Sequence, residues 1–254
     1  WLGIFQDTLF DDRANDYAYA FWRDKVRERI HDPELAEKLA PKLDVKGWVV
    51  MTDKPASEIE TSLDNVVFYE DLIKDKPETY DWPVVDEKTA AYAGYTTGTT
   101  GRPKGVYYSH RSIYLHTIGG LAALGATFND TVMPITPMFH VHAWGVPYVA
   151  TMLGVKQVYP GRYEPDMLCR LIKEEKVTFS HCVPTILQML LSAPGAQGHD
   201  FGGMKMIIGG SALNRSLYEA AKARGIQLTA AYGMSETCPL ISCAYLNEEL
   251  RAGS

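Results

Sequence analysis

The sequence predicts an α/β protein with mostly parallel β-sheets flanked by helices. From residue 89 onward, short apolar segments alternate with helix-like segments of about ten residues. This alternation is typical of βαβ units, in which helices cover both faces of a parallel sheet. Ligands bind such sheets beyond the carboxyl ends of the strands, and the unusual loops of this sequence follow Tyr95, Ile208 and Tyr232.

The predicted elements follow from apolar periodicity and from residues that start helices. Asp32 with Pro33, Ser109, Pro165 and Asn214 are of types that cap or open a helix. In the helix that Ser109 caps, apolar residues recur on one side at Leu115, Ile118, Leu121 and Leu124. Strands are expected at 47–51, 90–95, 131–137, 155–160, 177–181, 204–208 and 226–232. Helices are expected at 18–30, 32–43, 68–74, 110–124, 142–153, 164–176, 183–192 and 214–224.

The composition is that of an ordinary globular protein, with 46% hydrophobic and 22% charged residues. A net charge of −6 argues against a nucleic-acid-binding surface. Four cysteines without a CxxC pair favour a reducing, cytoplasmic location. No apolar run is long enough to span a bilayer, and no signal peptide is recognisable. Because the sequence begins with Trp1 and ends without a structural stop, we expect the chain to be incomplete at both ends.

The strongest signal is the segment 95–106, YTTGTTGRPKGV, which follows a predicted strand. Its glycines let the backbone approach a ligand and turn N–H groups toward an anion, and its threonines add hydroxyl donors. Lys104 adds a positive charge, but Gly105 stands where a Walker A loop has the Ser or Thr that binds magnesium. A flexible surface loop is the alternative, and the strand before Thr96 together with the Pro-Lys-Gly end disfavours it.

Two further loops follow predicted strands. Gly209 and Gly210 belong to GGSAL (209–213), which taken alone is ordinary turn chemistry. Glu236 ends AYGMSE (231–236), and a lone glutamate after a turn is usually a solvated charge. Neither segment by itself indicates a site.

The segment PMFHVHAWG (137–145) contains His140 and His142, which share a face if they lie in a strand. A zinc site, as in a metallohydrolase, would recruit His181 and Cys182, but no carboxylate or HExxH spacing supports it. Histidines at the edge of the core explain the pair better. The apolar residues of HCVPTILQML (181–190) suit an alkyl chain or a core helix equally: Ile186, Leu187 and Met189.

In this order, the loops at 95–106, 209–213 and 231–236 resemble the motifs of the adenylate-forming superfamily. The segments 137–145 and 181–190 resemble acyl-site segments of its fatty acyl-CoA synthetase branch. The resemblance implies part of the large N-terminal domain of the acyl-CoA synthetase fold. It also implies a ligase that converts a medium- or long-chain fatty acid to acyl-AMP and then to acyl-CoA, using ATP, Mg²⁺ and coenzyme A.

The resemblance further implies roles for single residues. Lys104, His140 and Glu236 would be catalytic, and Thr96 and Glu236 would hold Mg²⁺. The acyl group would contact His140, Trp144 at the tunnel mouth, and the wall residues Val183, Pro184 and Thr185. The nucleotide would contact Thr96, Thr97, Gly98, Thr99, Thr100, Gly101, Lys104, Gly209, Gly210, Ser211, Ala212, Ala231, Tyr232, Gly233, Met234, Ser235 and Glu236.

Within that set, Tyr232 would stack on adenine and Ser235 would contact the α-phosphate. Thr97 and Ser235 stand where Ser and Thr are commoner in the family, and both keep the hydroxyl. Attack of a carboxylate on the α-phosphorus depends on positioning and charge stabilisation more than on acid–base groups. The lack of a Ser-His-Asp set therefore does not count against this chemistry.

The expected organisation is one incomplete AMP-binding domain over residues 1–254, with a subdomain division near 85–95. The ribose-binding aspartate, the hinge and the C-terminal catalytic lysine of the family cannot be placed, so the chain alone is expected to be nearly inactive. Adenylation of an aryl or short-chain acid and a non-catalytic nucleotide-binding module remain alternatives. The expected partners are small molecules, without nucleic acid or membrane, and a homodimer is allowed.

Overall fold

The chain forms two compact units, residues 1–84 and 85–254, which are described separately. The computed structural model describes residues 2–3, 33–42, 47–50, 52, 54–96, 104–138, 140–161 and 163–244. The expected helix at 18–30 and the capping Asp32 lie outside these residues, whereas Pro33 opens a helix as predicted.

The first unit contains a three-stranded sheet in the order β1-β2-β3. Its strands are β1 (Leu2–Gly3), β2 (Trp48–Val50) and β3 (Val66–Phe68). β1 pairs antiparallel and β3 parallel with the central strand. The helical elements are α3 (Pro33–Leu39), η2 (Ala40–Lys42), η3 (Ala56–Glu58) and α4 (Tyr69–Ile73).

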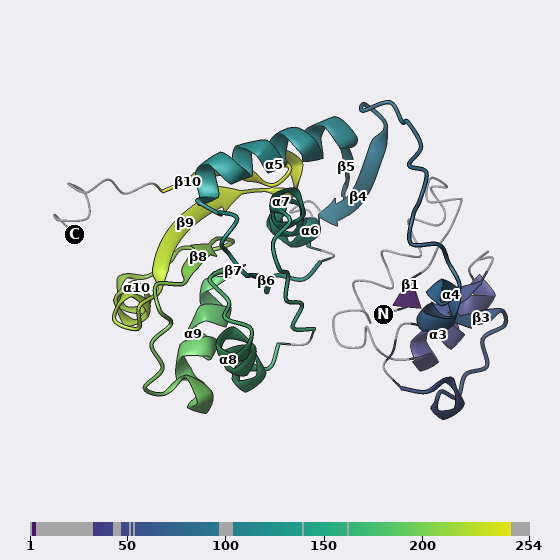
Figure 1. The fold of residues 1–254 in the computed structure, drawn as a ribbon, viewed down its shortest axis with the longest axis horizontal. Helices are drawn as coiled ribbons and strands as arrows, with labels where there is room; N and C mark the ends of the chain where they lie inside the picture. The colour runs from purple at the N-terminus through teal and green to yellow at the C-terminus, as the bar shows by residue number, and fades with distance from the viewer. Residues whose placement is uncertain are drawn as a thin grey trace. The chain divides into compact units, whose positions relative to one another are not determined.

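The second unit is built on a five-stranded sheet in the order β10-β9-β8-β7-β6 (Figure 1). Four of its strands are parallel neighbours: β6 (Val132–Pro134), β7 (Phe179–Cys182), β8 (Lys205–Ile208) and β9 (Gln227–Gly233). β10 (Leu240–Cys243) returns antiparallel along β9. The predicted α/β class and the mostly parallel sheet are confirmed.

Helices cover both faces of this sheet (Figure 1). One layer holds α5 (His110–Leu124), α6 (Val141–Trp144) and α7 (Val146–Leu153). The other holds α8 (Pro165–Glu174), α9 (Pro184–Ser192) and α10 (Arg215–Lys222). Short 3-10 turns are η4 (Pro194–Ala196) and η5 (Ser235–Thr237).

The alternation of side chains along β7 divides the core into two clusters. Cys182 packs into the cluster on the α8, α9 and α10 side, with Leu187, Leu190 and Met206. Phe179 packs into the cluster on the other side, with residues such as Val146. Because residues two apart share a face of a strand, His181 faces the same side as Phe179, toward α6 and α7.

The predicted helix caps are confirmed where the side chain of the capping residue bonds the first turn of its helix. The Ser109 side chain accepts a hydrogen bond from the Ser112 amide, and the Asn214 side chain accepts one from the Leu217 amide. Pro165 is the first residue of α8.

The apolar side predicted for α5 is confirmed only in part, because Leu124 is the one leucine of that side that is buried. Leu115 and Ile118 are exposed, whereas Thr117, Gly120 and Leu124 are buried. The reason is close packing against α7, because a Cβ at Gly120 would lie only 3.3 Å from Val149 Cγ2.

Two strand predictions also need correction. The segment 155–160 forms only an isolated bridge between Gln157 and Val132. The segment after Lys104 is a strand, β5 (Lys104–Ser109), which pairs antiparallel with β4 (Ala90–Thr96) in a separate two-stranded sheet. Among the described residues, no helix has the length and apolar character needed to cross a bilayer.

Candidate functional site

Several predicted site residues meet at the carboxyl edge of the parallel sheet. Val183 follows β7, Gly209 follows β8, and Ala231 lies at the corresponding level of β9. A Cβ at Gly209 would lie 3.1 Å from the Ala231 carbonyl oxygen. Gly210 has a φ of 83°, and a Cβ there would lie 3.0 Å from Val183 Cγ1. The two glycines therefore permit a backbone approach that other residues would obstruct.

The loop between β9 and β10 holds the remaining part of the 231–236 motif. The Met234 amide donates a hydrogen bond to the Pro239 carbonyl at 3.0 Å. Thr237 Oγ1 also bonds within this turn, to the Met234 and Pro239 carbonyls. The closed turn leaves Tyr232 58% exposed and Glu236 exposed, so both side chains are available to a ligand.

The β4–β5 hairpin fixes both ends of the glycine- and threonine-rich loop, since Thr96 pairs with Lys104. The predicted nucleotide residues within that loop lie outside the described residues: Thr97, Gly98, Thr99, Thr100 and Gly101. The Tyr108 hydroxyl, on β5, donates a hydrogen bond to the Ser235 carbonyl. This bond connects the strand that leaves the loop with the motif that follows β9. Ser211 and Ala212 are exposed before α10.

The segment 141–145 departs from both sequence-based expectations. It is neither a strand nor the start of a right-handed helix, because Val141, His142, Ala143 and Trp144 all have φ between 46° and 58°. Gly145 has a φ of 77°, and the right-handed helix α7 begins only after it. Such left-handed residues cost roughly 1–2 kcal/mol each, so tertiary contacts must hold them in place.

Aromatic packing around His142 supplies those contacts. Its ring lies edge-on to Tyr92 and near Tyr108 and Tyr148, and Nδ1 is hydrogen-bonded to the Tyr148 hydroxyl. Burial lowers the pKa of His142 to about 4, so the ring is neutral near pH 7. His140, in contrast, is exposed. The two histidines therefore do not share a strand face, and the left-handed turn gives them different environments.

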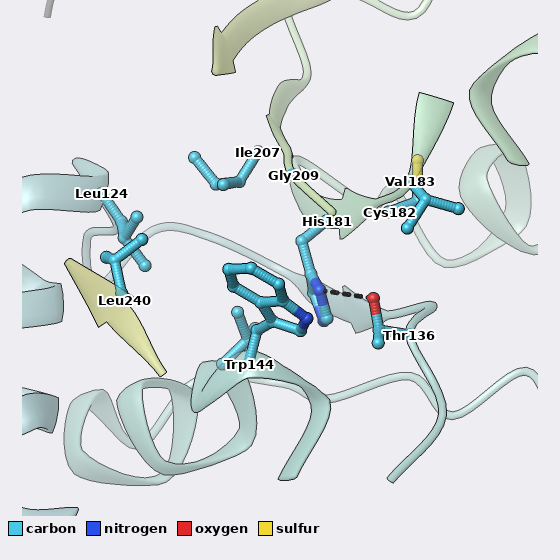
Figure 2. Close-up of a pocket in the computed structure, with 10 residues that line it drawn as sticks. Leu124, Thr136, Trp144, His181, Cys182, Val183, Ile207, Gly209 and Leu240 are labelled. Atoms are coloured by element: carbon cyan, nitrogen blue, oxygen red, sulfur yellow. Dashed lines mark hydrogen bonds between the residues drawn. The ribbon is translucent and has the colours of Figure 1, made fainter. Parts of the chain in front are cut away.

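The left-handed turn also places the Trp144 indole at the carboxyl edge. Its ring atoms approach to 3.4 Å from the position of a Cβ on Gly209. Figure 2 shows the indole beside His181 in a pocket between the sheet and α7. The pocket is mostly apolar and is lined by Leu124, Thr136, Trp144, Val146, His181, Cys182, Val183, Ile207, Gly209 and Leu240. Pro184 is buried and Thr185 is exposed at the start of α9.

The side chains named for a zinc site have other surroundings in the part of the chain that the structure describes. No group of three or more His, Cys, Asp or Glu side chains gathers among the described residues. His181 Nδ1 instead lies 3.0 Å from Thr136 Oγ1, and Cys182 Sγ lies 3.6 Å from Met206 Sδ.

Sequence reasoning missed several residues of this site. Thr136 and Ile207 line the pocket, and Tyr108 contacts the 231–236 motif, although none carries a motif signal. His181 begins the segment 181–190 that resembles an acyl-site segment, but the sequence assigns it no role of its own apart from the zinc alternative. Its position two residues after Phe179 in a buried strand is the signal that places it on the pocket face.

Comparison with known proteins adds independent information. The AMP-binding enzyme family matches residues 23–254. A 3-methylmercaptopropionyl-CoA ligase of Ruegeria pomeroyi is 38% identical over 214 residues, which are 81% of this chain and 39% of that protein. A medium-chain-fatty-acid–CoA ligase of Ectopseudomonas oleovorans is 39% identical, over 82% of this chain and 39% of that protein. The chain thus spans about two fifths of the length of these curated relatives.

Among solved structures, a long-chain-fatty-acid-CoA ligase from Archaeoglobus fulgidus superposes with a TM-score of 0.66 at 23% identity. The match covers 84% of this chain and 48% of that one. At this identity the likeness concerns the fold.

Proposed function

Because the chain belongs to the AMP-binding enzyme family, we propose that it is the nucleotide- and acyl-binding core of a longer AMP-forming acid–CoA ligase. In the first step, the carboxylate of the acid attacks the α-phosphorus of ATP, which forms acyl-AMP and releases pyrophosphate. In the second step, the thiol of coenzyme A attacks the acyl carbon, which forms acyl-CoA and releases AMP. The proposed acid is a medium- or long-chain fatty acid.

One observation carries this proposal: three chain segments that are far apart in sequence meet at the carboxyl edge of the sheet. Gly209 lies against Ala231, the exposed Tyr232 ring follows, and Tyr108 holds the Ser235 carbonyl. A flat exposed ring beside close backbone and hydroxyl groups suits an adenine with its phosphates. The edge is also where ligands bind in parallel sheets.

In this proposal, the chain's own residues position the reactants and stabilise charge. Lys104, anchored opposite Thr96, offsets the charge that develops at the phosphates. Tyr232 stacks on adenine beside Gly209, Gly210, Ser211 and Ala212, and Ser235 approaches the α-phosphate. His140, exposed before the left-handed turn, is placed toward the carboxylate.

A magnesium ion fits the character of this edge. Glu236 is exposed and makes no ion pair with any residue that the structure describes, and Thr96 offers a hydroxyl at the end of β4. Hard oxygen ligands and a substrate phosphate are what Mg²⁺ prefers. The ion supplies charge neutralisation for the phosphates when it is bound, and Thr96 and Glu236 are the residues that would hold it.

The acid would lie along the pocket of Trp144 and Val183, beside Pro184 and Thr185. A second candidate substrate class is a short acid with a heteroatom in its chain. The small size of the pocket favours it, as does the likeness to a relative named for 3-methylmercaptopropionate.

The four cysteines are free, which supports a reducing, cytoplasmic location for the protein.

The test is pyrophosphate release by the full-length protein with a ladder of straight-chain fatty acids, with and without coenzyme A. We expect release that depends on the acid, and acyl-CoA formation only when coenzyme A is added. The 254-residue chain alone should be nearly inactive. Absence of pyrophosphate release with every acid, although the protein is folded and binds ATP, would favour a non-catalytic nucleotide-binding module.

Variants of the charged residues sharpen this test. Lys104→Ala and Glu236→Ala should each lower the adenylation rate by about 100- to 1000-fold without unfolding the protein. Lys173→Ala and Glu219→Ala, at exposed positions of α8 and α10, are matched controls that should keep the full rate. A wild-type rate with normal magnesium dependence in either active-site variant would contradict the role given to that residue.

A further inference from the structure

The pocket beside Trp144 contains one buried polar atom without a partner. His181 is only 3% exposed and projects from β7 among apolar side chains (Figure 2). Its Nδ1 is 3.0 Å from Thr136 Oγ1, but its Nε2 has no hydrogen-bond partner among the described residues. Buried polar atoms are nearly always paired, so a partner for Nε2 is expected from outside the chain.

The charge state of His181 limits what that partner is. Burial lowers the pKa of His181 to about 3, so the ring is neutral near pH 7. A neutral ring donates at one nitrogen and accepts at the other, so Nε2 forms a hydrogen bond without needing a charged partner. In the proposed function the carboxylate of the acid lies toward His140, so the expected partner of Nε2 is an uncharged polar group on the chain of the acid.

A trapped water fits this position poorly. The cavity has a volume of about 20 Å³, enough for about one water. A buried water normally has two to four polar partners. The lining of the pocket as a whole is largely apolar, Thr136 already bonds Nδ1, and the indole N–H of Trp144 and the backbone of Gly209 are the further polar groups of the lining. A ligand group that brings its own hydrogen bond replaces such a water at little loss.

We propose that His181 is a specificity-determining residue, whose Nε2 forms a hydrogen bond with a hydroxyl group on the chain of the acid substrate. The inference rests on the proposed function, in which the acid lies in the pocket of Trp144 and Val183. A hydroxyl suits either tautomer of the ring. If Thr136 donates to Nδ1, then Nε2–H donates to the hydroxyl oxygen; if Thr136 accepts, Nε2 accepts from the hydroxyl.

This geometry makes the pocket discriminate against unsubstituted chains. A plain alkyl acid that fills the pocket displaces any water and leaves Nε2 buried and unpaired. A site that forms a hydrogen bond with a substrate hydroxyl rejects analogues without that hydroxyl strongly. An apolar site discriminates much less between substrates that differ by one methylene group. The enzyme should therefore prefer a hydroxylated acid over the plain acid of equal length.

The experiment measures kcat/KM by pyrophosphate release with the full-length protein. The substrates are pairs of acids with equal carbon number. One member of each pair is unsubstituted and the other carries a single hydroxyl, whose position moves by one carbon from pair to pair. We expect the wild type to prefer the hydroxylated member at one or more positions by about 10-fold or more. His181→Leu should lower this ratio to about 1, mainly through faster use of the plain acid.

Two further variants separate recognition from folding. His181→Gln keeps a polar group near the position of Nε2 and should retain part of the preference. Phe179→Leu changes the same face of β7 without lining the pocket, so the ratio should stay at the wild-type value. If His181→Leu does not fold, the test uses the wild type and His181→Gln. A preference for the hydroxylated acid in the wild type that is smaller in His181→Gln supports the role of His181, and an unchanged preference contradicts it.

The outcomes distinguish the inference from its premise. Equal use of both members of every pair by the wild type overturns the role of His181, as does an unchanged ratio in His181→Leu. Pyrophosphate release with plain acids in those cases leaves the ligase activity intact. Absence of release with every acid refutes the proposed function itself, and this inference with it.

Discussion

Gly233 ends β9 where the chain turns toward β10, and the turn has no room for a methyl group. A Cβ built on Gly233 would lie 2.1 Å from the carbonyl oxygen of Pro239 and 2.8 Å from its carbonyl carbon. These are backbone atoms, so no side-chain rotation relieves the overlap. In Gly233→Ala the turn itself must open, which weakens the bond from the Met234 amide to the same carbonyl.

The expected loss of stability combines two effects. Overpacking of this kind costs about 1–3 kcal/mol, and a lost hydrogen bond costs about 1 kcal/mol more. For a unit of this size, a loss of about 2–4 kcal/mol lowers the melting temperature by roughly 4–16 °C. Because Tyr232, Ser235 and Glu236 flank the turn, the rate of pyrophosphate release should fall as well.

Gly119→Ala is the matched control for this substitution. Gly119 lies inside α5, and a Cβ there would meet no atom within 4 Å. Alanine is the better helix former, so this variant should gain about 0.5–1 kcal/mol. Thermal and urea unfolding of the full-length protein compare the two variants with the wild type. Equal stability of Gly233→Ala and Gly119→Ala, with an unchanged rate for both, would refute the reasoning from backbone overlap.

Three further changes address stability, positioning and the acid pocket. Burial opposes the charged form of Asp130, but hydrogen bonds led by Lys205 outweigh it and lower the pKa below its usual 3.8. Asp130→Asn should therefore cost about 1–3 kcal/mol at pH 7 in urea unfolding, and the gap should close as the pH falls below about 4. Tyr108→Phe removes the donor to the Ser235 carbonyl and should lower kcat/KM for ATP, with about 0.5–1.5 kcal/mol of stability lost. Trp144→Ala should shift the preference among acid chain lengths, measured as kcat/KM across the ladder.

Each of these has a control of the same residue type at an exposed position. Asp71→Asn, Tyr114→Phe and Trp82→Ala should leave stability and rates near wild type. A pH-independent effect of Asp130→Asn would show that its charge is not the cause. An unchanged kcat/KM for ATP in Tyr108→Phe would remove its positioning role. A large loss of melting temperature with an unchanged chain-length profile would make Trp144 a core residue only.

Local signals predicted the parts of the fold that depend on local chemistry. Ser109 and Asn214 cap their helices because their oxygens bond amides three residues ahead. The alternation of strands and helices predicted the parallel sheet, since its strands pair in chain order. β5 was missed because its pairing with β4 spans a loop and leaves no mark in the periodicity of 104–109.

The left-handed turn at 141–144 could not be predicted from the sequence, and the reason is physical. Of the four residue types only histidine is enriched at positive φ, so Val141, Ala143 and Trp144 adopt this conformation through tertiary contacts such as the aromatic cluster around His142. The pocket also depends on contacts between residues that are far apart in the sequence. The contact between His181 and Thr136 joins residues 45 apart, and nothing in either segment indicates it.

The order of the parallel strands bears on how the protein folds during synthesis. β6, β7, β8 and β9 are neighbours in the same order as along the chain, so each strand adds to the one before it after closing a moderate loop. We expect this part to assemble progressively, in the manner of domains that fold as they are synthesised.

The bonds that connect β5 and α5 with the segment after β9 belong to a later stage of that process. The bond from Tyr108 to Ser235 joins residues 127 apart, and the bond from the Leu240 amide to His116 joins residues 124 apart. Neither forms until β9 and the start of β10 have been made, so the sheet core precedes the site. A chain interrupted before residue 235 would contain the strands β6 to β9 of the sheet without either bond. If the proposed function holds, nucleotide binding would therefore report that folding of this unit is complete.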